Sequence, residues 1–301
     1  MNPIPHKDNQ NFTWSMKEGP FEYLSEEQIT LFNSEGYLVV ENAFEADLVL
    51  DVIEKIDPYE FNVTEALRGL DGGKFFISRA EEITFTTHLV TQSVELKDFS
   101  KHKIFRKVCK DLIGDDVRLY WDQAVYKKPG TADEFPWHQD NGYTFVEPQA
   151  YLTCWVALTD TDEFNGCPWI MPGLHKQGTL HHETTDLGYE IDLDSSKAIP
   201  VPLKAGSIAV FSSLTPHRTG PNTSEGIRKA YILQYAPEGA VRKISHSLTE
   251  PVNDESRQYL ILKEGKEVLL FFKKTRHSLV CTYKVFFKIL HHVTSRNTLI
   301  H

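Results

Sequence analysis

The segment Trp137-His138-Gln139-Asp140 places an imidazole and a carboxylate two residues apart. In an extended chain alternate side chains point to the same side, so His138 and Asp140 would face one point. A histidine and an aspartate in this arrangement are two of the ligands of a facial triad, which binds Fe(II) on one side and leaves positions open on the other. The segment therefore predicts part of a metal site that needs another histidine from a distant strand.

His217 is the candidate for that third ligand, because the apolar run 208–211 predicts a strand that leads to it. Arg228 follows eleven residues later and begins another apolar run. Its guanidinium is suited to bidentate binding of a carboxylate. Thr219 would lie on the same face as His217 and could add a hydroxyl. This spacing predicts a metal on one side of the site and a dicarboxylate on the other.

Taken together, these residues resemble the phytanoyl-CoA dioxygenase family of Fe(II)/2-oxoglutarate-dependent oxygenases. The resemblance extends over about residues 24–262 and is carried by segments 137–140, 165–175 and 215–219, with Arg228 at its spacing. It implies a double-stranded β-helix core, also called a jelly roll and similar to cupins, with N-terminal helices packed on it. The expected fold class is therefore α+β.

The resemblance also implies roles for individual residues. The iron ligands would be His138, Asp140 and His217. Arg228 and Thr219 would bind the distal carboxylate of 2-oxoglutarate. Three further residues lie where the family often lines the cofactor pocket, namely Gln123, Lys128 and Trp155.

The activity implied by the resemblance is hydroxylation of a small molecule at an unactivated C–H bond. O2 and 2-oxoglutarate would be consumed, and succinate and CO2 would be the co-products. The presence of Asp140 favours hydroxylation over halogenation, because related halogenases replace this ligand with Gly or Ala. Tyr143 and Phe145 follow closely and are candidates for lining the substrate pocket.

Two alternatives stay open at this point. One is a cupin-like metal-dependent isomerase or dioxygenase that does not use 2-oxoglutarate, for which Arg228 would not be needed. The other is a non-catalytic binding protein with an oxygenase-like fold. The adjacent histidines His181 and His182 do not predict another metal site, because neighbouring side chains diverge in a strand.

The elements that must position these residues can be read from periodicity. Ser25 and Gln28 have capping-box spacing and predict a helix that ends near Gly36. A strand at 37–40 and helices at 45–56 and 101–113 are expected next. After Gly114 the pattern changes to short β-rich runs separated by turn residues, at 117–126, 151–158, 168–171, 207–212 and 228–235.

Composition limits the classes of partner. The 301 residues are 41% hydrophobic and 25% charged, which is ordinary for a globular protein. The net charge of −10 argues against binding to nucleic acid or to an anionic membrane, and no apolar run is long enough for a membrane-spanning helix. Without a visible targeting signal, the expected location is cytoplasmic. The sequence indicates no particular oligomeric state.

Three regions are expected along the chain. Residues 1–22 should form a flexible arm, and 23–262 a single oxygenase domain. Residues 263–301 form a basic and apolar tail of unknown role, since seven Lys or Arg and one acid lie between 266 and 301.

Overall fold

The structure is a computed structural model that describes residues 3–245 and 247–268. Contacts divide the chain into two compact units, 1–268 and 269–301, of which the second lies outside the described residues. Most of the predicted basic tail therefore also lies outside them. No helix in the described ranges is long and apolar enough to cross a membrane.

The larger of two facing sheets contains ten strands, and neighbouring strands in it are antiparallel. All five β-rich runs that the sequence predicts after Gly114 are confirmed at nearly the predicted bounds, four of them in this sheet and the fifth in the facing one. The main path of the larger sheet is, in spatial order, β1 (Tyr37–Val40), β13 (Ile208–Ser212), β8 (Leu152–Ala157), β15 (Arg228–Pro237), β5 (Val117–Lys127), β4 (Ile83–Thr87), β3 (Ser78–Arg79) and β2 (Lys74–Phe75). A hairpin of β18 (Leu260–Lys263) and β19 (Lys266–Glu267) pairs with β5.

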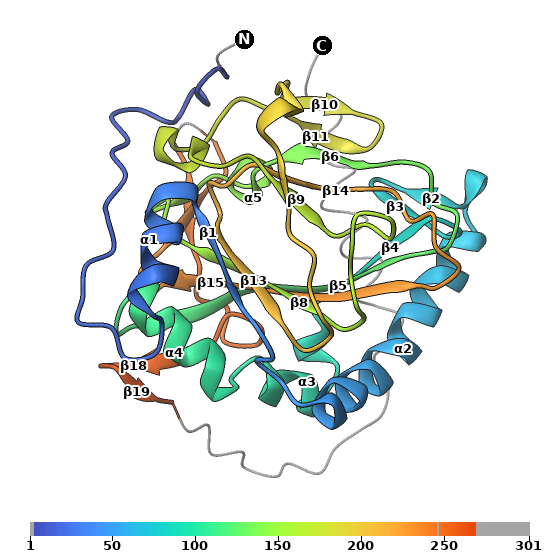
Figure 1. Ribbon diagram of the computed structural model, residues 1–301, viewed down its shortest axis with the longest axis horizontal. Coiled ribbons are helices and arrows are strands. Elements are labelled where there is room, and N and C mark those ends of the chain that lie inside the picture. The colour runs from blue at the N-terminus through green and yellow to red at the C-terminus, as the bar shows by residue number, and fades with distance from the viewer. Residues whose placement is uncertain (1–2, 246, 269–301) are drawn as a thin grey trace. The chain divides into compact units, whose positions relative to one another are not determined.

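The smaller sheet faces the central strands of the larger one (Figure 1). It consists of β12 (Ile199–Pro200), β9 (Pro168–Ile170), β14 (His217–Thr219) and β6 (Phe135–His138). Apolar side chains from both sheets meet in one buried cluster, which includes Phe135, Ile170, Trp155 and Phe211. Two facing antiparallel sheets with this strand order form the predicted double-stranded β-helix.

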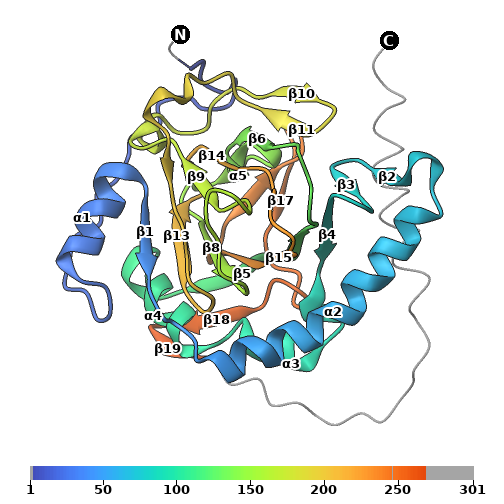
Figure 2. The same cartoon turned by 45° about the vertical axis from the view of Figure 1, so that its right-hand side comes forward.

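Short additional strands lie around this core. One three-stranded sheet joins β17 (Thr249–Pro251), β16 (Val241–Lys243) and β7 (Val146–Glu147). A separate hairpin consists of β10 (Glu183–Thr185) and β11 (Gly188–Glu190) and lies next to β6 in Figure 2. The backbone N–H of Ile191, just after this hairpin, donates to the carbonyl of Trp137 over 2.7 Å.

Helices cover the outer face of the larger sheet, so the fold is α+β as predicted (Figure 1). They are α1 (Glu26–Glu35), α2 (Ala46–Arg68), α3 (Val94–Phe99) and α4 (Lys103–Leu112), while the single turn α5 (Asp140–Tyr143) lies at the end of β6. Short 3-10 turns occupy Asp71–Gly73, Leu89–Thr91, Leu174–Gln177 and Ser195–Lys197. At α1 the predicted capping box is present, and Gly36 ends the helix with a φ of 88°.

The second helix is longer than the sequence predicts. The sequence pattern predicts an end at Ile56. Pro58 removes a backbone N–H, and proline disfavours a helix interior. The helix instead continues to Arg68, with Pro58 inside it. Its buried face continues through Glu60, Thr64 and Leu67, so packing against the sheet outweighs the missing hydrogen bond.

The N-terminal arm also differs from the expectation of a loose segment. Pro5 forms a β-bridge with Leu180, and the N–H of His6 donates to the carbonyl of Thr179 over 2.9 Å. Trp14 packs edge-on against His175, with ring centroids 4.4 Å apart. These partners are distant in sequence, so local composition carries no sign of them.

Candidate functional site

His138, Asp140 and His217 come together at the end of the smaller sheet. His217 is the register partner of His138 across β14 and β6, and their ring centroids are 4.1 Å apart. Asp140 begins the turn that follows β6. One ligand atom from each residue lies within 4.8 Å of the others, which is a separation that a single metal ion can bridge. The predicted meeting of the three side chains is confirmed.

Both histidines have the same hydrogen-bonding pattern. The Nδ1 atom of His138 lies 2.8 Å from the carbonyl of Pro136, and that of His217 lies 3.0 Å from the carbonyl of Thr215. An N–H donated from Nδ1 leaves the lone pair of Nε2 free as a metal ligand. Burial lowers the pKa of His138 to about 3 and that of His217 to about 4, so both rings are neutral at physiological pH.

The carboxylate of Asp140 is oriented by residues of the larger sheet. Thr153 donates its hydroxyl hydrogen to Oδ2 of Asp140, and the amide of Gln234 donates to Thr153 over 3.2 Å. The other oxygen, Oδ1, lies 3.9 Å from Nε2 of His217. Burial raises the pKa of Asp140, while His138 and these hydrogen bonds act in the opposite direction. Sequence analysis missed Thr153, although it shares a strand face with Trp155.

The side chain of His182 supports the backbone between His138 and Asp140. The N–H of Gln139 donates to Nε2 of His182 over 2.9 Å, and Nδ1 of His182 lies 2.9 Å from the carbonyl of Leu180. The ring of His182 packs directly on Gly142, where a Cβ atom would overlap it. His182, to which sequence analysis assigned no role, thus contacts both the backbone between the two ligands and the turn that follows Asp140.

Arg228 begins β15 and is 1% exposed. Its Nη1 donates to the carbonyl of Val125 over 3.2 Å, and its guanidinium carbon lies 5.3 Å from the ring of Trp155. Its Nε and Nη2 are buried without a hydrogen-bond partner. Burial lowers the pKa of Arg228 to about 10. A buried guanidinium with unused donors is suited to binding an anion.

Lys128 does not line this space. Its ammonium forms a 2.6 Å ion pair with Glu60 of α2, on the outer side of the larger sheet. The adjacent Lys127 is the buried lysine, directly opposite Arg228 in the register of β5 and β15. Because successive side chains of a strand point to opposite faces, an offset of one residue exchanges an outer lysine for an inner one.

Of the other predicted cofactor residues, Gln123 and Trp155 lie on strands that the sequence predicts, whereas Thr219 lies on a short strand that it does not predict. Thr219 is buried in β14, opposite Phe135 and Pro168 in register. Gln123 is opposite Ile232 in register, and its Oε1 accepts a 3.2 Å hydrogen bond from Nε1 of Trp121. Ile232 and Trp155 are in turn register partners and belong to the cluster between the sheets.

The two candidates for the substrate pocket are placed differently. Tyr143 packs edge-on against His138, with ring centroids 5.4 Å apart, and its hydroxyl accepts the N–H of Tyr189 over 3.2 Å. Phe145 instead stacks on His6 of the arm, with centroids 5.0 Å apart, and lies 5.0 Å from the ammonium of Lys243. The ring of Phe145 thus contacts the N-terminal arm and Lys243. A contact between Phe145 and the substrate stays a prediction.

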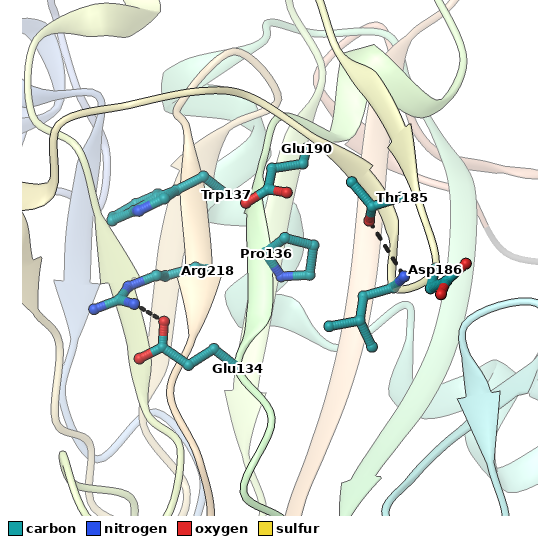
Figure 3. A pocket seen from close by; sticks show the side chains of 8 residues that line it. Glu134, Pro136, Trp137, Thr185, Asp186, Glu190 and Arg218 are labelled. Carbon is teal, nitrogen blue, oxygen red and sulfur yellow. Dashed lines mark hydrogen bonds and ion pairs between the residues drawn. The ribbon is translucent and has the colours of Figure 1, made fainter.

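The outer face of the smaller sheet carries a separate surface cleft of about 380 Å³ (Figure 3). Trp137 and Arg218 line it, each adjacent in sequence to one candidate metal ligand. They point away from the ligands because strand side chains alternate. Figure 3 shows the guanidinium of Arg218 paired with Glu134. This cleft therefore lies behind the site and not within it.

Comparisons with known proteins agree with this geometry. The family model for phytanoyl-CoA dioxygenase matches residues 32–230. Phytanoyl-CoA dioxygenase from Arabidopsis thaliana is 25% identical over 248 residues, covering 70% of this chain and 88% of that protein. Phytanoyl-CoA dioxygenase domain-containing protein 1 from Danio rerio is 26% identical over 257 residues, covering 69% and 88%.

Solved structures share the fold at lower sequence identity. The α-ketoglutarate-dependent carbocyclase SnoK from nogalamycin biosynthesis superposes with a TM-score of 0.61 at 21% identity, covering 84% of this chain and 98% of its own. EctD from S. alaskensis, solved with 2-oxoglutarate and 5-hydroxyectoine, gives 0.59 at 19% identity, covering 80% and 85%. Because the family model spans most of this chain and every predicted site residue, the chain belongs to the phytanoyl-CoA dioxygenase family.

Proposed function

We propose that this chain binds Fe(II) through His138, Asp140 and His217 and acts as a non-haem iron- and 2-oxoglutarate-dependent oxygenase. Its proposed reaction is the hydroxylation of a small molecule at a carbon in an apolar part of that molecule. The observation that carries the proposal is the meeting of three ligand atoms within 4.8 Å beside a buried arginine with unused donors. A buried charge with unpartnered donors generally costs stability unless a ligand binds it, which favours a binding role for such a group.

The residues present fit these cofactors. Two neutral imidazoles with free Nε2 atoms and one carboxylate match the ligand set of non-haem Fe(II) sites. The unpartnered Nε and Nη2 of Arg228 match the two oxygens of a carboxylate. In the proposed site Arg228 and Thr219 bind the distal carboxylate of 2-oxoglutarate, while Gln123 and Trp155 line its path toward the metal.

When bound, Fe(II) would activate O2, which is the oxidant, and the oxidation of 2-oxoglutarate to succinate and CO2 would supply two of the four electrons that O2 accepts. The protein orients the ligands and keeps the site dry. Thr153 and Gln234 fix the carboxylate of Asp140, and the backbone carbonyls of Pro136 and Thr215 fix the two imidazoles. Phe135 and Phe211 pack on those imidazoles, with centroids 4.9 and 4.5 Å away, and exclude water from that side.

The aromatic and aliphatic side chains around the cluster between the two sheets favour a substrate with an apolar part. Ile77, Phe85 and Tyr143 are partly buried against the cluster between the sheets. Tyr189 of the β10–β11 hairpin packs on Tyr143, with centroids 4.9 Å apart. Such rings bind hydrocarbon surface well and offer few partners for charge.

The charge of the chain disfavours a coenzyme A thioester. The net charge is −10 over the 301 residues, and an acidic protein repels the phosphates of coenzyme A. We therefore propose a free small molecule as substrate, although relatives are named for a CoA ester. We also propose a cytoplasmic location, supported by the buried free thiols of Cys109, Cys154 and Cys167.

Anaerobic titration of the purified apoprotein tests the assignment of the site. Fe(II) followed by 2-oxoglutarate should produce a weak visible absorption band that requires both additions. His217→Ala should abolish the band, whereas His181→Ala, at an exposed histidine, should retain it. A folded wild-type protein that binds iron but gives no band would exclude 2-oxoglutarate as the co-substrate and favour a cupin-like enzyme.

Substrate screening then tests the second part of the proposal. Succinate release is measured with Fe(II), 2-oxoglutarate and O2 in the presence of free apolar acids, their CoA thioesters and polar amino-acid derivatives. Stimulation by free molecules with an apolar portion is expected. Stimulation by the thioesters alone would contradict the proposed substrate class without affecting the assignment of the metal site.

A further inference from the structure

Gln139 directly precedes the candidate ligand Asp140, and its side chain is fully buried. Its Oε1 accepts the N–H of Leu180 over 2.6 Å, and its Nε2 donates to the carbonyl of Gly178 over 3.0 Å. The same Nε2 donates over 2.5 Å to the carbonyl of Leu214, in the segment that leads to β14. One buried amide therefore joins the backbone before Asp140 to two segments that are distant in sequence.

Asn141, on the other side of Asp140 in sequence, is equally buried. Its Nδ2 donates to the hydroxyl of Thr179 over 2.6 Å, and its backbone N–H donates to the carbonyl of Ser213 over 3.1 Å. Both neighbours of Asp140 thus bind the segment 177–180, hereafter the bridging segment. A displacement of this segment would either leave buried amides without partners, which is costly, or shift the backbone of Asp140 with it.

The N-terminal arm also binds the bridging segment. Asn9 donates from Nδ2 to the carbonyls of Gln177, over 2.7 Å, and Thr179, over 3.0 Å. Gly178 between them has a φ of 73° and a ψ of −160°, which essentially only glycine adopts. A Cβ atom at Gly178 would lie 2.5 Å from Oδ1 of Asn9. Since the carbonyl of Gly178 accepts from Gln139, the arm and the ligand segment meet at this one glycine.

We propose that the N-terminal arm supports the metal site and that Asn9 is a positioning residue for Asp140, acting through the bridging segment. This inference rests on the proposed function. The pairing of β6 and β14 fixes the two histidine ligands, whereas Asp140 begins a turn beyond the end of β6. Its position therefore depends on the buried amides beside it. A carboxylate that is already oriented loses less entropy when the metal binds, so displacing the arm would lower metal affinity without removing a ligand.

Co(II) titrations of the full chain test the role of Asn9. Co(II) reports both affinity and ligand arrangement, because its visible absorption depends on the coordination geometry. Asn9→Ala removes the hydrogen bonds to the bridging segment and, at a partly exposed position, should leave the protein folded. Affinity should fall by about 3- to 30-fold, the range for residues that act on a site through packed neighbours. The Co(II) spectrum should change as well, since Asp140 would be less well oriented.

Asn33→Ala is the matched control at the other end of the arm. Asn33, in α1, accepts the N–H of Lys17 over 2.8 Å and donates to its carbonyl over 2.9 Å. Its loss should lower the melting temperature but leave the affinity for Co(II) and the spectrum unchanged. If Asn9→Ala keeps the wild-type affinity, or if both variants lower the affinity equally, the arm only stabilises the fold and the proposal is overturned. A folded wild-type protein that binds no Co(II) would instead overturn the proposed function.

A double-mutant cycle with Gln139→Met tests the route from the arm to the ligand. Methionine has a shape similar to that of glutamine but makes none of the three hydrogen bonds, so Co(II) affinity should fall by about 10- to 100-fold. In this background Asn9→Ala should lower affinity clearly less than in the wild type, because the connection is already lost. Fully additive effects would contradict a route through the bridging segment. Should Gln139→Met fail to fold, the comparison of Asn9→Ala with Asn33→Ala still decides the proposal.

Discussion

His138 and His217 are register partners across β6 and β14, so the backbone pairing of the smaller sheet alone fixes two of the three candidate metal ligands. Asp140 follows in the turn after β6 and is held by side chains of the facing sheet. The site is thus formed by residues of two facing sheets. Residues that orient the ligands should therefore affect metal affinity more than they affect folding.

Thr153→Val tests this expectation for Asp140. Valine has nearly the shape of threonine but cannot donate the hydrogen bond to Oδ2 of Asp140. The carboxylate would lose its orientation and Gln234 would lose an acceptor. We expect Mn(II) or Co(II) affinity to fall by about 10- to 100-fold, the usual effect of removing such a supporting hydrogen bond. Titration calorimetry measures it.

Thr86→Val is the matched control. Thr86 is also buried in a strand of the larger sheet, but its hydroxyl has no hydrogen-bond partner. Valine should therefore leave metal affinity unchanged and keep or slightly raise the stability, because a buried unsatisfied hydroxyl is lost. Equal effects of the two substitutions on metal affinity would count against a specific role for Thr153.

Gly142 and His182 should be energetically coupled. A methyl group at Gly142 overlaps the His182 ring, which accepts the N–H of Gln139 between the two ligands. Gly142→Ala is expected to destabilise the protein by about 1–3 kcal/mol, as overpacking does, and to weaken metal binding. His182→Ala should restore part of the stability in the double variant, because it removes the overlapping ring.

A double-mutant cycle by urea unfolding measures this coupling. A coupling energy of about 1 kcal/mol or more is expected for residues in direct contact. His181→Ala combined with Gly142→Ala serves as the control, since the exposed His181 side chain should not relieve the overlap. Strictly additive effects of Gly142→Ala and His182→Ala would mean that the turn adjusts without the ring.

Local sequence patterns were sufficient for much of the fold. The capping box at Ser25, the strand runs after Gly114 and the spacing from His217 to Arg228 all depend on residues near one another in the chain. They correspond to α1, to the sheet strands and to the beginning of β15. Each of these features has a periodicity or a turn residue that can be read without knowing the tertiary structure.

Two kinds of feature could not be read in this way: the face of a strand on which a side chain lies, and contacts between segments distant in sequence. Lys127 and Lys128 are adjacent, and which of them faces the interior depends on the register of β5 with its neighbouring strands. His182 reaches the turn after β6 only because segment 178–182 folds back over it. Pro58 remains helical because the face of α2 beyond it is covered by the sheet.

Acid should destabilise the protein over a defined range of pH. Burial lowers the pKa of His88, His175, His182 and His217 to about 4 and that of His138 to about 3. In the unfolded chain these groups take up protons near 6.5. Between pH 6.5 and 4 the unfolded state therefore binds more protons, and the free energy of unfolding falls as the pH falls.

Urea unfolding of the metal-free protein at pH 7, 6, 5 and 4 checks this dependence. Asp122 and Asp140 act in the opposite direction, since burial raises the pKa of both, to about 6 for Asp122, but five histidines outweigh two carboxyls. Metal affinity should persist to about pH 5, because His138 and His217 are still neutral there. A stability that is constant from pH 7 to 4 would contradict the neutral state of these buried rings.

Arg228→Met should separate stability from cofactor binding. The guanidinium is buried with two unused donors, and its pKa is lowered to about 10 by burial, so the folded protein holds it at a cost. Methionine fills a similar volume without a charge. Replacement of such a group by an apolar side chain is often neutral or stabilising. The melting temperature of the metal-free protein should therefore stay equal or rise, whereas the stabilisation by 2-oxoglutarate in the presence of Mn(II) should disappear.

Arg118→Met provides the contrast, because this buried arginine already has partners. It pairs with Glu238 and Glu255 and donates to the carbonyl of Gln258 over 2.8 Å. Its loss should lower the melting temperature and leave the shift caused by 2-oxoglutarate intact. If Arg228→Met instead destabilises the metal-free protein as much as Arg118→Met does, then Arg228 has a structural role. The unused donors of Arg228 would then be no sign of a ligand site.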